Sequence, residues 1–212
     1  MTGVLTARLD AGLAALALEL PEAQKAQLLS YLTEFHKWNR AYNLSAIRDI
    51  DAMLDRHLLD SLSVLAAVRR RRPQRLIDVG TGGGLPGIPL AIALPDCAVT
   101  LLDSNGKKTR FLFHVKTHLR LSNVTVENRR VEQYQPAEPF DIVISRAFAS
   151  LSDMVTGCEH LLTGSGLFMA MKGVYPQDEL DEVADRVELL DTQRLQVPRN
   201  EGERHLLELG LR

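Results

Sequence analysis

Cysteine and aromatic residues are scarce in this chain. Of its 212 residues, 2 are cysteine and 1 is tryptophan, and aromatic residues together make up 5%. Cys97 and Cys158 are too few for a disulfide framework, and they lack the close spacing of paired metal ligands. We therefore expect two ordinary buried thiols rather than a disulfide or a zinc site.

Long hydrophobic runs are absent as well. Charged residues interrupt the apolar stretches well before the roughly 18 residues that a membrane-spanning helix requires. Residues Met1 to Asp10 have no basic start followed by an apolar core and a small-residue cleavage site, so they do not resemble a signal peptide. With 45% hydrophobic and 25% charged residues, the composition is that of a globular domain. These features predict a cytoplasmic protein without membrane contacts, and nothing in them demands more than a monomer.

Neither sign of charge dominates. The 25 Lys and Arg residues against 27 Asp and Glu give a net charge of −2, so charge alone does not indicate a nucleic-acid-binding protein. The cations nevertheless gather in three clusters: Arg69–Arg72 with Arg75, Lys107 and Lys108 with Arg110, and Arg129 with Arg130. Each cluster by itself is typical of a solvated surface, whereas several clusters around one cofactor site would suit phosphate contacts.

Two patterns divide the chain near Pro73. Before it, apolar residues recur at helical spacing in three segments, near 5–18, 21–42 and 51–68. From Gln74 onward, strand-like and helix-like runs alternate, which is typical of a parallel α/β sheet. The sequence therefore predicts a helical N-terminal extension over 1–73 and an α/β domain over 74–212.

The α/β part contains seven strand candidates. They lie at 75–79, 98–102, 123–127, 140–145, 165–171, 188–197 and 204–210. Helix candidates follow at 87–94, 106–119, 150–162 and 177–187. The last two strands are separated only by a turn that contains Pro198, Asn200 and Gly202, which predicts an antiparallel final pair. The fold class is α/β, a seven-stranded, Rossmann-like sheet with a helical N-terminal extension.

The most informative segment joins the first strand to the helix that follows it. The apolar run Leu76–Val79 leads into glycines at 80, 82, 83 and 84, where the missing Cβ lets the backbone approach a ligand closely. Asp103 ends the next apolar run, 23 residues after Gly80, and its carboxylate could accept both hydroxyls of a ribose. This arrangement predicts a site for a nucleoside cofactor.

Two cofactors fit this segment. Gly82 to Gly87 matches the dinucleotide pattern G-x-G-x-x-G. A dinucleotide turn, however, starts directly after the strand, here at Gly80, and its third glycine would then fall on Leu85. An acid inside the strand followed by G-x-G, here Asp78, Gly80 and Gly82, is the pattern of S-adenosylmethionine (SAM) methyltransferases, whose sheet also has seven strands. The residues favour SAM. Two alternatives remain: a dinucleotide cofactor, and a tight turn that binds no ligand.

Short segments spread over nearly the whole chain form one further pattern. They are Trp38-Asn39, Tyr42-Asn43-Leu44, His57, Asp60-Ser61-Leu62, Asp78 to Pro89, Leu101-Leu102-Asp103-Ser104, Arg130-Val131-Glu132, Ser145-Arg146-Ala147, Lys172-Gly173 and Gly202-Glu203-Arg204-His205. In order and spacing they resemble the bacterial RsmG (GidB) family, which methylates guanine N7 in 16S ribosomal RNA. The resemblance implies a SAM-dependent enzyme whose partner is 16S rRNA or the small ribosomal subunit.

The same resemblance implies SAM contacts at five positions: Gly80, Leu85, Val131, Glu132 and Arg146. Arg146 ends the fourth predicted strand, on the carboxyl edge where open α/β sheets bind ligands. Glu132 could instead be an acid at a helix N-terminus, and Arg146 a structural ion pair. Arg130, Lys172 and Arg204 are the candidates for RNA contact, because such side chains bind phosphate and guanidinium groups also stack on bases. Each of these three could instead form a surface ion pair.

The residues after the fourth predicted strand bear on the chemistry. Ser145-Arg146-Ala147-Phe148 is neither the Asn/Asp-Pro-Pro-aromatic loop that methylates exocyclic amines nor a Pro-Cys nucleophile for carbon 5 of pyrimidines. Guanine N7 needs neither device, since its lone pair lies in the ring plane and no proton must leave. We therefore predict catalysis by alignment, worth ~7–11 kcal/mol in ideal cases, without a catalytic general base.

Histidines give little support for a metal site. His114 and His118 lie one helical turn apart, and His36 and His57 lie elsewhere, but no third ligand is placed nearby in sequence. We predict no metal. The residues leave three other functions open: methylation of a small molecule or protein, a non-catalytic nucleotide-binding module, and a dinucleotide-dependent oxidoreductase.

Overall fold

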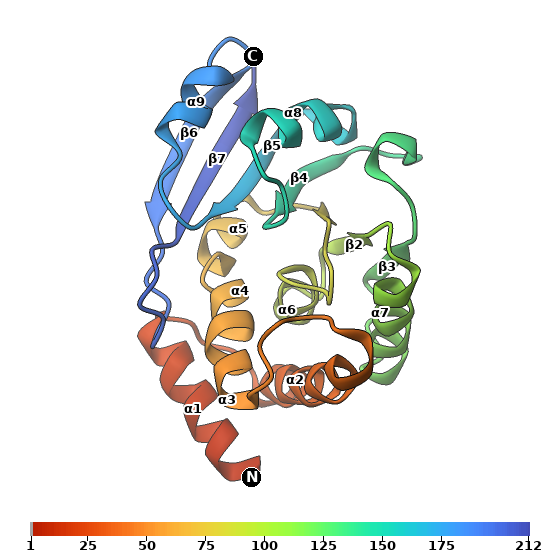
Figure 1. Cartoon of the computed structure of the whole chain (residues 1–212), viewed down its shortest axis with the longest axis vertical. Helices are drawn as coiled ribbons and strands as arrows, with labels where there is room; N and C mark the ends of the chain where they lie inside the picture. Colours follow the sequence, from red (N-terminus) through yellow and green to blue (C-terminus); the bar gives the residue numbers. More distant parts are fainter. Residues whose placement is uncertain (1) are drawn as a thin grey trace.

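The computed structural model describes residues 2–212, which form a seven-stranded mixed sheet with helices on both faces (Figure 1). The strand order is β3-β2-β1-β4-β5-β7-β6. Strands β1 to β5 are parallel, and β7 is antiparallel to both β5 and β6. The strands are β1 (Arg75–Val79), β2 (Ala98–Leu102), β3 (Val124–Glu127), β4 (Phe140–Ser145), β5 (Leu162–Lys172), β6 (Val187–Arg194) and β7 (His205–Leu211). The seven-stranded Rossmann-like fold with its antiparallel final pair is confirmed.

Helices precede β1 and fill most of the connections between strands. They are α1 (Thr2–Ala15), α2 (Glu22–Tyr42), α3 (Ile50–Met53), α4 (Asp60–Leu62), α5 (Leu65–Arg71), α6 (Gly87–Ala93), α7 (Gly106–His118), α8 (Leu151–Cys158) and α9 (Gln177–Glu182). A π-helical turn, η1 (Leu54–Leu59), and two 3-10 turns, η2 (Val131–Gln133) and η3 (Glu159–Leu161), complete the set. Within residues 2–212, no helix combines the length and apolar character needed to cross a membrane.

Successive residues of the inner strands contribute to two separate cores. On β1, Leu76 packs into one core and Ile77 into the other, and Ile142 and Val143 of β4 divide in the same way. The helices before β1, together with α6 and α7, cover the first face, and α8 and α9 cover the second. Because neighbouring side chains of a strand point to opposite faces, a strand covered on both faces is apolar at nearly every position. The inner strands read as unbroken apolar runs in the sequence because both of their faces are buried.

The structure corrects the third predicted helix, 51–68. The segment from Ile50 to Arg71 is divided into α3, η1, α4 and α5. At the end of η1 the N–H of Asp60 bonds the carbonyl of Asp55, five residues back. A π-helical turn inserts a residue into the helix and is frequent at functional sites. The helices before β1 share one core with α6, α7 and the sheet, and the division into two domains at 73/74 stays a prediction.

Helix α2 braces the glycine-rich turn that follows β1. The buried Tyr31 hydroxyl donates a 2.7 Å hydrogen bond to the carbonyl of Gly83. A Cβ on Gly83 would overlap the ring of Phe35, so only glycine fits beneath this helix. The N-terminal helices therefore shape the turn as well as covering the sheet.

Removing the Tyr31 hydroxyl tests this bracing. Tyr31→Phe leaves the buried Gly83 carbonyl without its partner, and we expect the free energy of unfolding to fall by about 1–3 kcal/mol. Urea denaturation measures the change. Tyr175→Phe is the matched control, since the Tyr175 ring packs 5.6 Å from that of His205 and its hydroxyl has no hydrogen bond in the described part of the chain. An unchanged midpoint for Tyr31→Phe would show that the hydroxyl does not hold the turn.

Candidate active site

A cavity of about 290 Å³ opens where the carboxyl ends of β1, β2 and β4 meet. Four of the predicted cofactor residues line it: Gly80, Asp103, Val131 and Glu132. Arg130, predicted to contact RNA, lies here as well, with Lys108 from α7 and with Ala147 and Phe148 from the loop after β4. We call this the cofactor cavity.

Asp103 is 8% exposed and already holds part of the cavity wall together. Its Oδ2 accepts the N–H of Gly82 at 2.9 Å, and its Oδ1 accepts the N–H of Asn105 at 2.8 Å. The Nζ of Lys108 lies 3.9 Å from Oδ2. A carboxylate offers about four lone-pair positions, so two remain for the hydroxyls of a ligand. The geometry fits the predicted ribose contact and adds a structural role for the same side chain.

The cavity wall at Gly80 has no room for a side chain. Gly80 lies at φ +69°, and a Cβ there would come within 2.7 Å of the Cβ of Ala147. Backbone from β1 and from the loop after β4 therefore lie side by side, which leaves the space above them open. An open backbone, a carboxylate with free lone pairs, and the partly buried apolar side chains of Val131 and Phe148 suit the polar and aromatic parts of SAM.

Asp78, the acid within β1, is fully buried. Its Oδ2 accepts hydrogen bonds from the Thr81 hydroxyl at 2.7 Å and from the N–H of Gly87 at 2.8 Å, whereas Oδ1 has no partner within residues 2–212. Burial raises the pKa of Asp78 from 3.8 to about 6, and the two hydrogen bonds oppose that rise. The strand acid thus joins the two ends of the glycine-rich turn.

A second cavity, of about 500 Å³, lies near the end of β4. Arg146, Lys172 and Arg204 line it. The other lining residues are Ile47, Arg56, His57, Asp60, Met171 and Gly173. Arg146 and Ala147 are consecutive yet line different cavities, so the two spaces lie on either side of the chain at the end of β4. We call the second space the basic cavity. It contains Arg146, which the sequence places with the cofactor residues.

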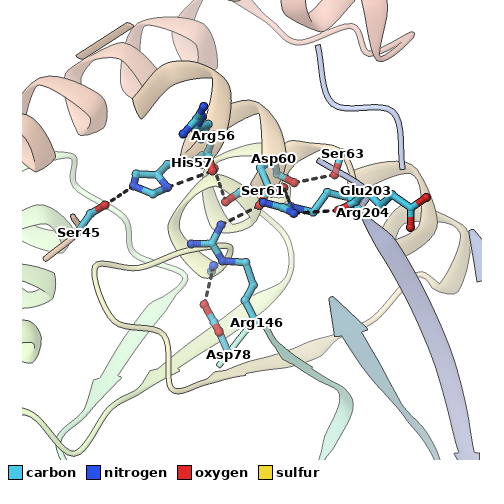
Figure 2. Close-up of polar contacts among 11 residues, drawn as sticks. Ser45, Arg56, His57, Asp60, Ser61, Ser63, Asp78, Arg146, Glu203 and Arg204 are labelled. Atoms are coloured by element: carbon cyan, nitrogen blue, oxygen red, sulfur yellow. Dashed lines mark hydrogen bonds and ion pairs between the residues drawn. The ribbon is translucent and has the colours of Figure 1, made fainter. Parts of the chain in front are cut away.

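Asp60 connects two arginines of the basic cavity (Figure 2). The Asp60 side chain is 3% exposed; its Oδ2 lies 2.8 Å from Nη1 of Arg146, and its Oδ1 lies 3.0 Å from Nε of Arg204. Figure 2 shows both guanidinium groups directed at this carboxylate. One buried charge therefore links α4 to the end of β4 and to the segment before β7. Removal of Asp60 would be strongly destabilising, because both guanidinium groups would lose their shared anion, whereas loss of one arginine leaves the other paired with the carboxylate.

His57 belongs to the same cluster as a neutral side chain (Figure 2). Burial, and secondarily the charge of Arg146, lowers the pKa of His57 from 6.5 to about 4. Its Nδ1 lies 3.0 Å from the Arg56 carbonyl and its Nε2 lies 2.7 Å from the Ser45 hydroxyl. A neutral imidazole next to a carbonyl must donate from Nδ1, so Nε2 accepts from Ser45. Both ring nitrogens are thereby occupied by structural hydrogen bonds.

Two predicted contact residues lie in less open surroundings. Lys172 donates to Oε2 of Glu179 at 2.8 Å, and its side chain is 13% exposed. Leu85 is buried in the core and lines neither cavity. The contacts of both stay predictions. His57 and Asp60 carry no role in the sequence analysis, although both lie in segments that carried the family resemblance.

The first basic cluster is not a phosphate site beside the cofactor cavity. Arg70 and Arg71 bind the fully buried Glu208 of β7 at 2.8 and 2.6 Å, and Arg75 pairs with Glu138 at 2.9 Å. Arg75 begins β1, so this cluster lies at the amino ends of the strands, away from both cavities. These arginines are solvated or form structural ion pairs. The other two clusters, at 107–110 and 129–130, contribute Lys108, Arg129 and Arg130 to the lining of the cofactor cavity.

The side chains considered for metal binding have other partners. His114 Nε2 lies 2.6 Å from Oε2 of Glu34, and its ring stacks on that of His118 with centroids 5.6 Å apart. Within residues 2–212, no group of three or more His, Cys, Asp or Glu is arranged to hold a metal ion. Cys97 and Cys158 are buried and free, and burial raises their pKa values to about 11 and about 12.

Known proteins resemble this chain along most of its length. A family model described as GidB, rRNA small subunit methyltransferase G, matches residues 24–207. Ribosomal RNA small subunit methyltransferase G of Cellvibrio japonicus is 58% identical over 98% of this chain and 95% of that protein. The protein of the same name from Saccharophagus degradans is 54% identical over 99% and 92%. The solved O-methyltransferase from Bacillus cereus in complex with SAH shares the fold, with a TM-score of 0.61 and 16% identity over 85% of this chain and 90% of that chain.

The raised pKa of Asp78 predicts a pH-dependent gain from Asp78→Asn. A folded-state pKa of about 6 above the starting value of 3.8 means that the folded protein holds this proton more tightly than the unfolded chain. Asp78 therefore reduces stability progressively as the pH rises through that interval, by about 3 kcal/mol in total. The asparagine side chain of the variant does not titrate. The stability of Asp78→Asn relative to the wild type should therefore rise by about 3 kcal/mol between about pH 4 and pH 7.

Urea denaturation at several pH values measures this difference in stability between Asp78→Asn and the wild type. The lowered pKa of His57 makes stability depend on pH in the opposite direction, but both proteins contain His57, so its contribution cancels in the difference. Asp96→Asn, which removes an exposed carboxylate, is the control for the loss of one negative charge. A difference that does not change with pH would contradict the raised pKa.

Proposed function

The chain belongs to the rRNA small subunit methyltransferase G family, and on this premise we propose that it transfers a methyl group from SAM to N7 of one guanine in small-subunit (16S) rRNA. The observation that carries the proposal is a pair of cavities at the carboxyl edge of the sheet, lined on either side by the consecutive residues Arg146 and Ala147. One has the carboxylate and open backbone that suit a nucleoside, and the other has the cations that suit RNA.

On the cofactor side, the chain offers three kinds of contact. Asp103 presents its remaining lone pairs to the ribose hydroxyls, and Gly80 leaves its backbone open to the methionine part. Val131 and Glu132, at the start of η2, lie where a backbone N–H and a carboxylate can read the adenine edge. When bound, SAM supplies a methyl group that is already activated on a sulfonium.

On the acceptor side, cations outnumber anions. The residues lining the basic cavity include Arg56, Arg146, Lys172 and Arg204 against the single acid Asp60. A phosphate or the O6 atom of a guanine can accept hydrogen bonds from such guanidinium groups. Asp60 fixes the directions of Arg146 and Arg204, so the two donors are already oriented before RNA arrives.

The surroundings of the two cavities agree with catalysis by alignment. Guanine N7 attacks with an in-plane lone pair, so no group must remove a proton. His57 is neutral, but both its nitrogens are occupied, and Asp78 is enclosed beneath the turn. The protein's task is to hold the acceptor in line with the methyl group and to exclude water, and positioning of this kind can supply ~7–11 kcal/mol in ideal cases.

Transfer of labelled methyl from SAM to small-subunit rRNA that lacks its native methylation tests the proposal. We would offer the RNA both protein-free and in assembled subunits, and identify the modified base after digestion. We expect N7-methylguanine at one position. The absence of transfer to either substrate, with SAM binding intact, would overturn the assignment of the acceptor.

Two variants should separate the two cavities. Asp103→Ala removes the charge-assisted hydrogen bonds expected to the ribose, which are worth about 1.5–3 kcal/mol each, together with the bonds that hold Gly82 and Asn105, and so should weaken SAM binding at least about tenfold. Arg204→Ala should lower kcat/KM for RNA by a similar factor and leave SAM affinity unchanged. Calorimetric titration of SAM and methyl-transfer kinetics measure the two effects, and each variant is the control for the other. An unchanged SAM affinity in Asp103→Ala would remove the ribose contact, and full activity of Arg204→Ala would remove that arginine from the acceptor site.

A further inference from the structure

Rings from α2 and α7 form a continuous row on the surface of the protein. The centroids of Trp38 and Tyr42 lie 4.9 Å apart, those of Trp38 and His114 lie 4.8 Å apart, and those of His114 and His118 lie 5.6 Å apart. Phe113, which precedes His114 on α7, is 50% exposed and makes no ring contact with this row within the described residues. Figure 1 shows α7 lying beside the C-terminal half of α2. The row and Phe113 thus bring several aromatic and imidazole rings to the part of the surface formed by α2 and α7.

Helix α7 also presents unneutralised cations. Helix α7 contains no acidic residue, and its Lys107, Arg110 and Lys116 form no ion pair within the described residues. The only acid in the second half of α2, Glu34, is bound by His114 at 2.6 Å and lies 3.8 Å from Lys37. We call the five rings and three free cations the aromatic–basic strip: Trp38, Tyr42, Phe113, His114 and His118 with Lys107, Arg110 and Lys116. Its charge is complementary to a polyanion.

The strip leads away from both cavities. Helix α7 begins three residues after Asp103, and its Lys108 lines the cofactor cavity. Helix α2 ends at Tyr42, and the loop that follows contributes Ile47 to the basic cavity. An RNA chain whose reacting base lies near Arg146 and Ala147 can therefore continue outward over α7 and the end of α2.

We propose that the aromatic–basic strip binds a single-stranded segment of RNA adjacent to the target guanine. This inference rests on the proposed function. Single-stranded bases expose their faces, and proteins bind them by stacking on aromatic or histidine rings while Lys and Arg contact the phosphates. A duplex hides its base faces, so it would leave Phe113 without a partner. The combination of rings and free cations thus favours an unpaired strand.

Two variants test the strip with assembled small subunits as substrate. Phe113→Ala removes an exposed ring, and the double variant Arg110→Ala/Lys116→Ala removes two exposed or half-exposed cations. We expect each to raise KM for the subunits about tenfold, in line with base stacking and phosphate binding of ordinary strength, with SAM affinity unchanged. The double variant should also lower the slope of log KM against log salt by about 0.7 for each phosphate that it no longer binds.

Arg69→Ala is the matched control, because Arg69 is exposed, forms no ion pair within residues 2–212 and lies near the opposite edge of the sheet. It should leave both KM and the salt slope as in the wild type. Binding of a fluorescent oligouridylate that contains one guanine, followed by anisotropy, reports on protein-free RNA. In the wild-type protein, the same RNA should protect Lys107 and Lys116 from acetylation, which requires no variant.

The outcomes distinguish this inference from the proposed function. Wild-type protein that fails to methylate small-subunit rRNA would overturn the function. Active wild type with unchanged KM in both strip variants, or with Lys107 and Lys116 unprotected, would overturn the strip and leave the function in place. A raised KM for subunits together with unchanged binding of the protein-free oligonucleotide would also overturn it, and would indicate a ribosomal protein as the partner instead.

Discussion

Two buried carboxylates hold the turn between β1 and α6, and the shape of the cofactor cavity depends on them. Asp78 accepts hydrogen bonds from Thr81 and Gly87, at the two ends of the turn, and Asp103 accepts the N–H of Gly82 in its middle. A buried donor without a partner costs about 1–3 kcal/mol, so the turn cannot change shape without losing several such contributions together. The raised pKa of Asp78 is the electrostatic cost of placing one of these carboxylates out of reach of water.

The second cavity depends on one shared negative charge. Asp60 gives one oxygen to Arg146 and the other to Arg204, and these arginines come from distant parts of the chain. Both guanidinium groups compete for the same negative charge, so an anion that attracts one of them strengthens the hold of Asp60 on the other. Arg146 is followed directly by Ala147 of the cofactor cavity wall, so the two cavities share a short piece of backbone at the end of β4.

The sequence predicts those parts of the structure that local patterns determine. The bounds of β1 and β2 agree residue for residue with the expected 75–79 and 98–102, because strands buried on both faces read as short apolar runs between turn residues. The glycine-rich turn is recognisable in the sequence because positive φ or close packing requires its glycines: Gly82 lies at φ +61°, and a Cβ on Gly83 would overlap Phe35. The division of 51–68 by η1 has no such local signature. Asp60 pairs with partners 86 and 144 residues away, which no pattern of neighbouring residues could indicate.

The arginines before β1 and the cations of the aromatic–basic strip differ in whether acidic residues neutralise them. A net charge of −2 gives no hint of nucleic-acid binding, yet it averages over two different populations of cations. Near the amino ends of the strands, Arg70 and Arg71 are neutralised by Glu208, which lies 137 residues or more further along the chain. Beside the cavities, Lys107 and Arg110 face water without acidic partners among the described residues. Because salt screens exposed charges beyond about 8–10 Å, only cations close to the bound RNA contribute to its affinity. The arrangement of free cations in space, rather than their number in the sequence, therefore decides where a polyanion can bind.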